Sequence, residues 1–266
     1  MLDWLHTTDR LLTTRSLGSA MEGYPEIDST NARALAWAAG GAQSGALVVA
    51  EYQSAGRGRL GRRWVGGRGE SLLFSVVLRP EGRVPSDHFG LLPLATGLAL
   101  RDSVLGYVGG QSVDLKWPND LLVGGKKCAG VLVESVIIPG RERWAVIGVG
   151  LNVNQRRFEA ELAPQATSLR LAGGQDVPRP ILLAQVLGAL EDRIEQMESK
   201  AAELIAEYGS ALRGIGEAVT VAQADGRVVQ GTLIGIDPTG ALRVSVQDQE
   251  HVFTAGEVTL SKAVPT

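Results

Sequence analysis

The sequence predicts an α/β (α+β) protein in which a β-sheet with helices on one side is followed by a small domain of short strands. Two observations predict this fold class. Apolar runs rich in Val, Leu and Ile, typical of buried strands, alternate with segments in which apolar residues recur every three or four positions, as in helices. From Gly216 onward the chain changes to brief strands separated by turn residues.

Composition excludes several classes of protein. With 266 residues and 44% hydrophobic side chains, the chain can bury a large core, and its net charge of -3 leaves no positive excess for coating nucleic acid. Cys128 is the single cysteine, so no internal disulfide forms and a cytoplasmic location is expected. The longest apolar stretch, Phe89–Leu100, contains Pro93 and is too short to span a membrane.

Six apolar segments are predicted to be strands of the larger domain. They cover residues 46–53, 71–79, 113–117, 120–123, 128–138 and 144–153. A Gly- and Arg-rich loop, residues 56–69, joins the first two strands, and residues 139–142 have the composition of a hairpin connection between the last two.

Three helical segments are predicted. Asp28–Asn31 provides four consecutive N-cap residues before the apolar-periodic residues 32–39. Residues 89–105 form a second helix, and residues 180–208 form one long helix or two helices broken near Met197. We expect these helices to cover the sheet.

The chain is predicted to comprise an arm and two domains. Residues 1–27 are polar and weakly patterned, which predicts an arm or a short helix and excludes a three-helix DNA-binding module. A composition shift and two glycines at Arg213–Gly216 separate the larger domain, residues 28–213, from the small domain, residues 214–266.

The loop after the first strand is a candidate binding site. Residues 56–61, Gly-Arg-Gly-Arg-Leu-Gly, match the G-x-G-x-x-G fingerprint of dinucleotide-binding proteins. That fingerprint must open a helix, whereas here another strand follows, which argues against a dehydrogenase. The arginines instead suit carboxylate and phosphate oxygens, and a solvated basic loop is the alternative. They are Arg57, Arg59, Arg62 and Arg63.

Three further segments place polar side chains beside apolar sequence. Lys116–Asp120 puts two charges around Trp-Pro, where they are either buried and paired or exposed on an edge strand. Lys126 and Lys127 lie on a Gly-flanked turn, where one faces an anion or both are solubilising. Residues 148–154 end in two asparagines, beside glycines that allow a ligand to approach the backbone, or the strand ends there in an Asx turn.

In this order, the segments closely resemble biotin protein ligases. The resemblance covers residues 28–154, and the C-terminal strands also fit the family. It implies an α/β catalytic domain with a mixed β-sheet, followed by a small SH3-like β-barrel. The motifs that carry it are Asp28–Asn31, Glu51–Gln53, Gly56–Trp64, Lys116–Leu121, Lys127 with Ala129–Gly130, and Gly148–Asn154.

The resemblance implies an ATP-dependent ligase. In this family the biotin carboxylate attacks the α-phosphorus of Mg-ATP to give biotinyl-5'-AMP, and the ε-amine of one carrier-protein lysine then displaces AMP. Biotin and ATP are therefore the implied substrates, with Mg²⁺ as cofactor. The implied partner is a biotin carboxyl carrier protein domain of a biotin-dependent carboxylase. Positive charge must offset the repulsion between two anionic reactants, which agrees with the basic motifs.

The same resemblance implies roles for individual residues. The ureido ring of biotin is expected to contact hydroxyls and amides, namely Ser29, Thr30, Asn31 and Gln53. The biotin carboxylate and the α-phosphate are expected to lie under a loop that stays mobile until ligand arrives, through Gly56, Arg57, Gly58 and Arg59. Lys127, rather than Lys126, is the expected catalytic lysine, acting with Arg57 and Arg59.

A second set of residues is expected to contact the nucleotide, with Trp64 near the adenine. This set is Arg59, Arg62, Trp64, Asn119 and Asn152. Asp120 is expected to contact the acceptor amine or to join a hydrogen-bond network, and no metal ligand is assigned. Cys128 stands where the family usually has an apolar residue, and we expect it to be core packing rather than a nucleophile.

Other outcomes remain open from the sequence. Fewer than 30 residues precede the Ser-Thr-Asn motif, so we expect no specific DNA binding, and a monomer and a homodimer are both compatible with the sequence. A lipoate or octanoate protein ligase shares the fold but needs an apolar head pocket, which the hydroxyls and amides disfavour. A non-enzymatic nucleic-acid-binding module would bind oligonucleotides with strong salt dependence and ignore ATP.

Overall fold

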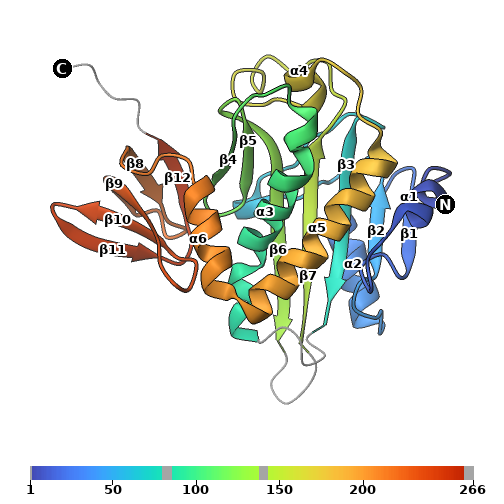
Figure 1. Ribbon diagram of the computed structural model, residues 1–266, viewed down its shortest axis with the longest axis horizontal. Coiled ribbons are helices and arrows are strands. Elements are labelled where there is room, and N and C mark those ends of the chain that lie inside the picture. The colour runs from blue at the N-terminus through green and yellow to red at the C-terminus, as the bar shows by residue number, and fades with distance from the viewer. Residues whose placement is uncertain (1, 80–85, 138–142, 261–266) are drawn as a thin grey trace.

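A seven-stranded mixed sheet forms the centre of the larger domain, in the order β1-β2-β3-β7-β6-β5-β4 (Figure 1). This computed structural model describes residues 2–79, 86–137 and 143–260, so the predicted connection at 139–142 lies outside the described residues. The strands are β1 (Met21–Tyr24), β2 (Leu47–Ala50), β3 (Ser71–Leu78), β4 (Val113–Lys116), β5 (Asp120–Val123), β6 (Lys126–Ile137) and β7 (Arg143–Asn152). β1 and β2 are parallel and the other neighbours antiparallel, which confirms the expected mixed sheet.

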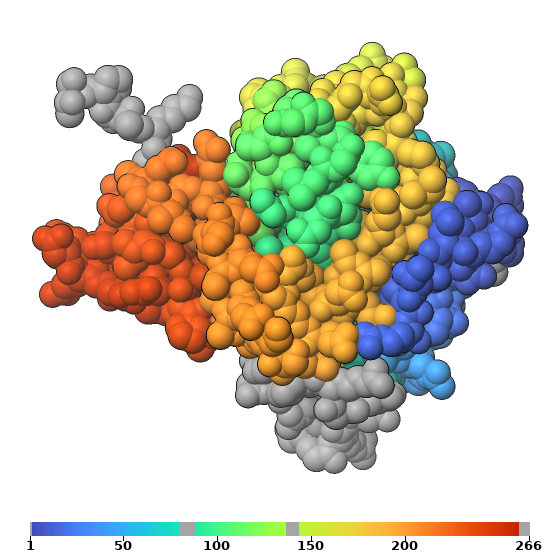
Figure 2. Space-filling model, in the orientation of Figure 1, coloured from blue at the N-terminus to red at the C-terminus, as the bar shows by residue number. Residues whose placement is uncertain are grey.

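Helices cover both faces of this sheet. They are α1 (Leu5–Leu11), α2 (Thr30–Ala39), α3 (Leu92–Val104), α4 (Leu169–Gly173), α5 (Arg179–Ser199) and α6 (Ala201–Ala211). The side chains of α3, α5 and α6 fill the face shown in Figures 1 and 2, whereas α2 contacts β2, β3 and β7. Neighbouring strand residues point to opposite faces, and Val49 packs in the main core while Val48 packs with Ala34 of α2. The expectation of helices on one side was therefore wrong for α2.

The boundaries of the helices follow from their caps and prolines. Ser29 caps α2, as predicted, and its side chain accepts a hydrogen bond from the backbone N of Ala32 at 3.4 Å. The segment predicted as a helix from residue 89 starts as 3-10 helix η2 (Ser86–Leu91), and Pro93 stands in the first turn of α3. A 3-10 turn, η3 (Leu105–Tyr107), follows α3.

The two-helix alternative for residues 180–208 is the correct one. α5 and α6 meet at Lys200, whose φ of -146° and ψ of 45° are not helical. The break falls three residues after Met197, which is fully buried in the core and remains part of α5. Because the two helices change direction there, α5 crosses the sheet while α6 lies toward the C-terminal strands (Figure 1).

The first 27 residues are part of the larger domain's fold rather than an arm beside it. The short-helix alternative agrees with α1, but β1 was not expected, and it extends the sheet by pairing with β2. Leu2, Leu5 and Leu17 are buried in the main core. All four residues of β1 are only half-buried, so this edge strand lacks the alternating pattern that identifies a strand from sequence.

The C-terminal strands form a second, five-stranded antiparallel sheet in the order β11-β10-β9-β8-β12, which confirms a small all-β domain. They are β8 (Ala218–Ala222), β9 (Val228–Ile236), β10 (Leu242–Val246), β11 (Gln249–Phe253) and β12 (Glu257–Leu260). This sheet meets the larger domain at α6 and at Trp117, whose Nε1 donates a hydrogen bond to the carbonyl of Gly240 at 3.0 Å. Across the described residues, no helix is both long and apolar enough to cross a membrane.

Candidate active site

A pocket of about 910 Å³, part of it open to solvent, lies between the Arg/Gly loop, the N-terminus of α2, the β4–β5 turn and strands β6 and β7. Gly256 and Glu257 of the C-terminal sheet close one side. The expected site residues that line it are Ser29, Thr30, Asn31, Gln53, Arg57, Gly58, Arg59, Arg62, Trp64, Asn119, Asp120 and Lys127. The structure thus brings together residues from five sequence motifs.

The floor of the pocket is a strip of sheet without side chains. Gly130 on β6 pairs with Gly150 on β7, and Gly148 lies two residues before Gly150. A Cβ atom at Gly148 would lie 1.8 Å from Oδ1 of Asn31, and one at Gly150 would lie 2.3 Å from Cε2 of Trp64. The glycines therefore allow Asn31 and Trp64 to lie close to the backbone, and close approach of a ligand stays a prediction.

One end of the pocket, which we call the ring end, consists of hydroxyl and amide groups. Ser29 and Thr30 are buried at the start of α2. The backbone N of Thr30 donates to Oε1 of Gln53 at 2.7 Å, and the Thr30 hydroxyl lies 3.1 Å from the same oxygen. Three of the residues expected to bind the ureido ring are therefore adjacent and held in fixed orientations, although their role stays a prediction.

Ser75 lies behind the ring end and contacts two of its residues, which the sequence did not predict. Its side chain is fully buried, and its Oγ lies 2.8 Å from Oγ1 of Thr30 and 2.6 Å from Oδ1 of Asn31. A single hydroxyl hydrogen serves one of these acceptors at a time, and the Thr30 hydroxyl can donate in its place. The available signal was Ser75 itself, a polar residue within the apolar run of residues 71–79.

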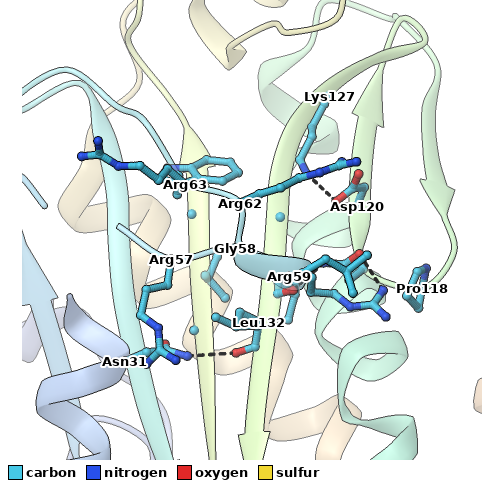
Figure 3. Close-up of a pocket in the computed structure, with 18 of the residues that line it drawn as sticks. Asn31, Arg57, Gly58, Arg59, Arg62, Arg63, Pro118, Asp120, Lys127 and Leu132 are labelled. Carbon is cyan, nitrogen blue, oxygen red and sulfur yellow. Dashed lines mark hydrogen bonds and ion pairs between the residues drawn. The ribbon is translucent and has the colours of Figure 1, made fainter. Parts of the chain in front are cut away.

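Asn31 and Arg57 share a carboxylate that the sequence did not identify. Nδ2 of Asn31 donates to Oε2 of Glu134 at 2.9 Å and to the carbonyl of Leu132 at 3.3 Å. The Arg57 guanidinium forms an ion pair with Oε1 of Glu134 at 2.9 Å. Figure 3 shows Arg57 beside Asn31, well separated from Lys127. This position differs from the expectation that Arg57 covers the reacting carboxylate and phosphate.

The Arg/Gly loop folds back on itself over the pocket. The backbone N of Gly58 donates to the carbonyl of Arg62 at 2.8 Å across the 3-10 turn η1 (Arg59–Gly61). Arg63 points away from the pocket centre, and its guanidinium donates to the carbonyl of Ser54 at 2.8 Å (Figure 3). The four arginines therefore do not act as one group, and mobility of the loop without ligand stays a prediction.

A β-bulge aims Lys127 into the pocket. Leu121 of β5 pairs with Ala129 of β6, but Leu122 pairs with Lys127, so Cys128 is the extra residue. Cys128 is fully buried in the main core, and burial raises the pKa of its thiol to about 12. This confirms its assignment to core packing, because a nucleophile would need the thiolate near neutral pH.

Lys127 lies between an acid and an indole. Its Nζ forms an ion pair with Oδ1 of Asp120 at 2.6 Å and lies 5.7 Å from the ring centroid of Trp64 (Figure 3). Lys126 is exposed, and its Nζ lies 3.4 Å from the carbonyl of Ala163, outside the pocket. The geometry therefore distinguishes the two lysines in the direction that the sequence predicted.

The end of the pocket that contains Lys127, which we call the charged end, also includes two arginines of the Arg/Gly loop and Glu257 of the C-terminal sheet. Nη1 of Arg59 donates to Oδ1 of Asn119 at a long 3.5 Å. Burial lowers the pKa of Arg59, and the charge of Asp120 opposes that shift. Arg62 donates to Oε1 of Glu257 at 2.6 Å, so the C-terminal sheet contributes to the pocket wall.

The Lys-Trp-Pro-Asn-Asp segment is the turn between β4 and β5. Trp117 is buried in the main core, and its peptide bond to Pro118 is cis. Lys116 and Asp120 face each other across the turn, and the Asp120 side chain is 16% exposed. The turn therefore places the charged side chains of Lys116 and Asp120 at the pocket. The alternative, in which both reach solvent from an edge strand, does not describe them.

Two expected site residues do not line the pocket. Asn152 is buried, with Nδ2 donating to the carbonyl of Thr167 at 3.1 Å and Oδ1 accepting from Gln155 at 3.2 Å. The structure therefore places this side chain away from the expected nucleotide site, at the end of β7. Gly56 lies behind the loop, where its carbonyl accepts from the backbone N of Trp64 at 3.0 Å.

Known proteins share this sequence and organisation. Residues 23–152 match the Biotin/lipoate A/B protein ligase family, and residues 214–261 match the Biotin protein ligase C terminal domain. The biotin–acetyl-CoA-carboxylase ligase of Mycobacterium tuberculosis is 37% identical over 260 residues, which cover 97% of this chain and 95% of that protein. The bifunctional ligase/repressor BirA of Escherichia coli is 33% identical, over 92% of this chain and 75% of that protein.

Solved structures agree with the fold of both domains. A biotin protein ligase from Aquifex aeolicus, solved in complex with biotin and ATP, superposes with a TM-score of 0.78 at 29% identity. The match covers 92% of this chain and 100% of the other. The C-terminal match is to a domain of biotin protein ligases, and the relatives described above are named as ligases that act with biotin or as BirA. These matches favour neither a lipoate ligase nor a non-enzymatic nucleic-acid-binding module. The chain belongs to the biotin protein ligase family.

Proposed function

We propose that this protein is a biotin–acetyl-CoA-carboxylase ligase. It forms biotinyl-5'-AMP from biotin and ATP and transfers the biotin to a lysine of a biotin carboxyl carrier protein. Family membership supports the reaction. The observation in this chain that carries it is one pocket with a hydroxyl and amide end, a side-chain-free floor and a basic end that contains Lys127.

Adenylation brings two anions together over the glycine floor. A carboxylate oxygen of biotin attacks the α-phosphorus of ATP, a new P–O bond forms, and pyrophosphate leaves with the electrons of the broken P–O bond. Lys127 offsets the charge that develops on the phosphoryl oxygens, and Arg59 holds the phosphate. Both groups act from a partly enclosed pocket, where such charges are screened less than in water.

Transfer uses the same end of the pocket. The carrier lysine attacks the acyl carbon of biotinyl-5'-AMP with a neutral ε-amine. A C–N bond forms, AMP leaves with the electrons of the broken acyl C–O bond, and the proton that the nitrogen loses passes to water. Lys127 stabilises the oxyanion of the tetrahedral intermediate, and Asp120, its ion-pair partner at 2.6 Å, orients the incoming amine. In this role the Asp120 carboxylate releases the Lys127 ammonium and contacts the amine of the carrier lysine instead.

Trp64, Arg62 and Asn119 are proposed to hold the adenosine and phosphate part of the adenylate. The indole of Trp64 already lies on the glycine floor, with an Nε1 that has no hydrogen-bond partner within the described residues. A flat apolar ring of this kind suits the face of a nucleobase. Asn152 is left out of this set because, unlike Asn119, it does not line the pocket.

Mg²⁺ is proposed to enter with the phosphates of ATP. Among residues 2–79, 86–137 and 143–260, no three His, Cys, Asp or Glu side chains form a metal-binding group. This agrees with the way Mg²⁺ is usually held in ATP sites, by phosphates, water and one or two carboxylates. When bound, the ion would neutralise phosphate charge; no residue of this chain is assigned to it.

The remaining expectations belong to the same proposal. The acceptor is the carrier domain of acetyl-CoA carboxylase, as the names of the relatives suggest. A cytoplasmic location is supported by the single, buried cysteine. The larger and small domains are proposed to meet at residues 213 and 214, just after the end of α6, where Arg213 donates its backbone N to the carbonyl of Leu115 in β4 at 2.8 Å.

Mass spectrometry of a carrier domain tests the function directly. After incubation with the protein, ATP and biotin, the carrier is expected to gain the mass of one biotinyl group on a single lysine. Lipoate in place of biotin is the matched control. A mass gain with lipoate and none with biotin would replace the proposed substrate.

A further inference from the structure

The carboxylate of Glu134 joins two elements of the ring end that are distant in sequence. Glu134 lies in the middle of β6, where it pairs with Val146. One of its oxygens holds the Arg57 guanidinium of the Arg/Gly loop, and the other accepts from Asn31 of α2, both at 2.9 Å. Its side chain is 24% exposed, so the ion pair is partly shielded from water.

Glu134 is also the last member of a continuous polar chain. From Gln53 the chain passes through Thr30 and Ser75 to Asn31, with separations of 3.1, 2.8 and 2.6 Å, and ends at Glu134. Asn31 has no donor left for a ligand, because Glu134 and a backbone carbonyl take both hydrogens of its amide. The chain therefore fixes which groups of the ring end remain available to a substrate.

The position of Arg57 assigns it to one end of the pocket. In Figure 3 Arg57 lies with Asn31, whereas Lys127 and Asp120 form the other group. Without Glu134, the guanidinium would lose its only ion-pair partner among the described residues and could turn toward solvent, since its side chain is 48% exposed. The Arg57 side chain would then be free at the ring end, although the backbone of the loop stays held by the bridge between Arg57 and Arg63.

We propose that Glu134 is a positioning residue for recognition of the bicyclic, ureido-bearing ring of biotin, acting by holding Arg57 and Asn31. This inference rests on the proposed function. Glu134 does not line the pocket and touches neither reacting group; it orders the residues that enclose the ring. Arg57 accordingly contributes to holding the vitamin, while Arg59 and Lys127 serve the step at phosphorus.

Replacing Glu134 by Gln tests this separation. The amide keeps one acceptor oxygen but presents NH₂ to a second donor, so one of the two contacts is lost. Loss of one charge-assisted contact predicts a rise of about tenfold in the KM for biotin. The KM for ATP and kcat are expected to stay within about twofold, measured by ATP–pyrophosphate exchange. Equal changes in the KM for both substrates, or no change in the KM for biotin, would overturn the inference.

Matched variants make the result specific. Glu203→Gln removes an exposed carboxylate of α6 and should leave both KM values unchanged. Glu134→Asp keeps the charge with a shorter reach and is expected to recover part of the biotin affinity. If Glu134→Gln fails to fold, judged by its melting curve, Glu134→Asp carries the same test.

A double-mutant cycle with Arg57→Gln then tests the route of action. If Glu134 acts partly through Arg57, Glu134→Gln raises the KM for biotin less in the Arg57→Gln background than in the wild type. An equal rise in the KM for biotin in both backgrounds would contradict the proposal that Glu134 acts by positioning Arg57. Failure of the proposed function is distinguishable, because the wild-type protein would then show no exchange with biotin at all.

Discussion

The two ends of the pocket differ in how their polar groups are held. At the ring end Ser29, Thr30 and Ser75 are at most 3% exposed and are tied to one another or to helix α2 by hydrogen bonds. At the charged end Lys127 and Arg62 have side chains that are 40% and 66% exposed and are held by ion pairs. The buried hydroxyl groups of the ring end are thus preorganised. The charged end, like Arg57 beside the ring end, is held by exposed ion pairs and is adjustable.

Physical chemistry accounts for this difference. A neutral ureido ring offers no charge, so its binding depends on donors and acceptors fixed in advance, and unsatisfied buried groups would be costly. Phosphates bring their own charge and can replace Asp120 or Glu257 as partners of the basic groups. Exposed ion pairs contribute little stability, so little is lost when a ligand breaks them. If the proposed function is correct, the pocket recognises the ureido ring by donors and acceptors fixed in advance and the phosphates by charge.

The largest effect is expected from Lys127→Ala. Removing the ammonium that faces the glycine floor should reduce biotinyl-5'-AMP formation about a thousandfold, because its charge is needed as the phosphorus gains oxygen ligands. Single-turnover release of pyrophosphate measures this step. Lys126→Ala is the matched control, and equal losses in the two variants would remove the distinction between the lysines.

A smaller effect is expected from Arg59→Ala. Loss of a charge-assisted contact to the adenylate phosphate should shorten the retention of biotinyl-5'-AMP by about thirtyfold, with a much smaller change in biotin affinity. Dissociation of labelled adenylate and of labelled biotin gives the two values. Arg227→Ala, in an exposed turn of the C-terminal sheet, provides the control. Parallel losses of both ligands would contradict the separation of the two ends.

Ser75→Ala tests preorganisation at the ring end. It leaves Oδ1 of Asn31 without its hydroxyl donor in a buried site, which is expected to weaken biotin binding about tenfold and to destabilise the fold by about 1 kcal/mol. Isothermal titration with biotin and thermal unfolding provide the measurements. Ser210→Ala, on the exposed face of α6, should change neither. If Ser75→Ala binds biotin as tightly as the wild type, the hydrogen bonds of Ser75 are not needed for biotin binding, and preorganisation of the ring end would not explain it.

The smallest effect concerns the loop itself. If the charged end adjusts to its ligands, trypsin cleavage after Arg59, Arg62 or Arg63 should slow about fivefold when biotin and ATP are both present. Cleavage after Arg227 should continue at the same rate. Loop cleavage that is equally slow without ligand would mean that this segment is already rigid, and the contrast between the ends would fail.

Much of the fold followed from local patterns. The six predicted strands and helix α2 carry uninterrupted apolar runs or a clear cap, and both signals depend only on neighbouring residues. β1 was missed because an edge strand of four half-buried residues has no such pattern. α2 was placed on the wrong face because periodicity shows which side of a helix is buried but not which side of the sheet receives it.

The candidate site divides in the same way. The chemical types of Ser29, Thr30, Gln53, Arg59 and Lys127 identified polar and basic motifs, and the resemblance arranged them into one site. Side-chain direction was not determined by the sequence. A bulge at Cys128 decides where Lys127 points, and the turn of the loop decides that Arg57 meets Glu134 rather than the charged end.

The sequence by itself determined the element types, the two-part organisation and the family, because these depend on residue order and local spacing. Only the tertiary structure decided that Ser75 and Glu134 hold residues of the ring end and that Asn152, expected at the nucleotide, does not line the pocket. Those assignments rest on contacts between residues 15 to more than 100 positions apart in the chain. Such contacts form only when strand register and helix packing bring distant side chains within hydrogen-bond reach.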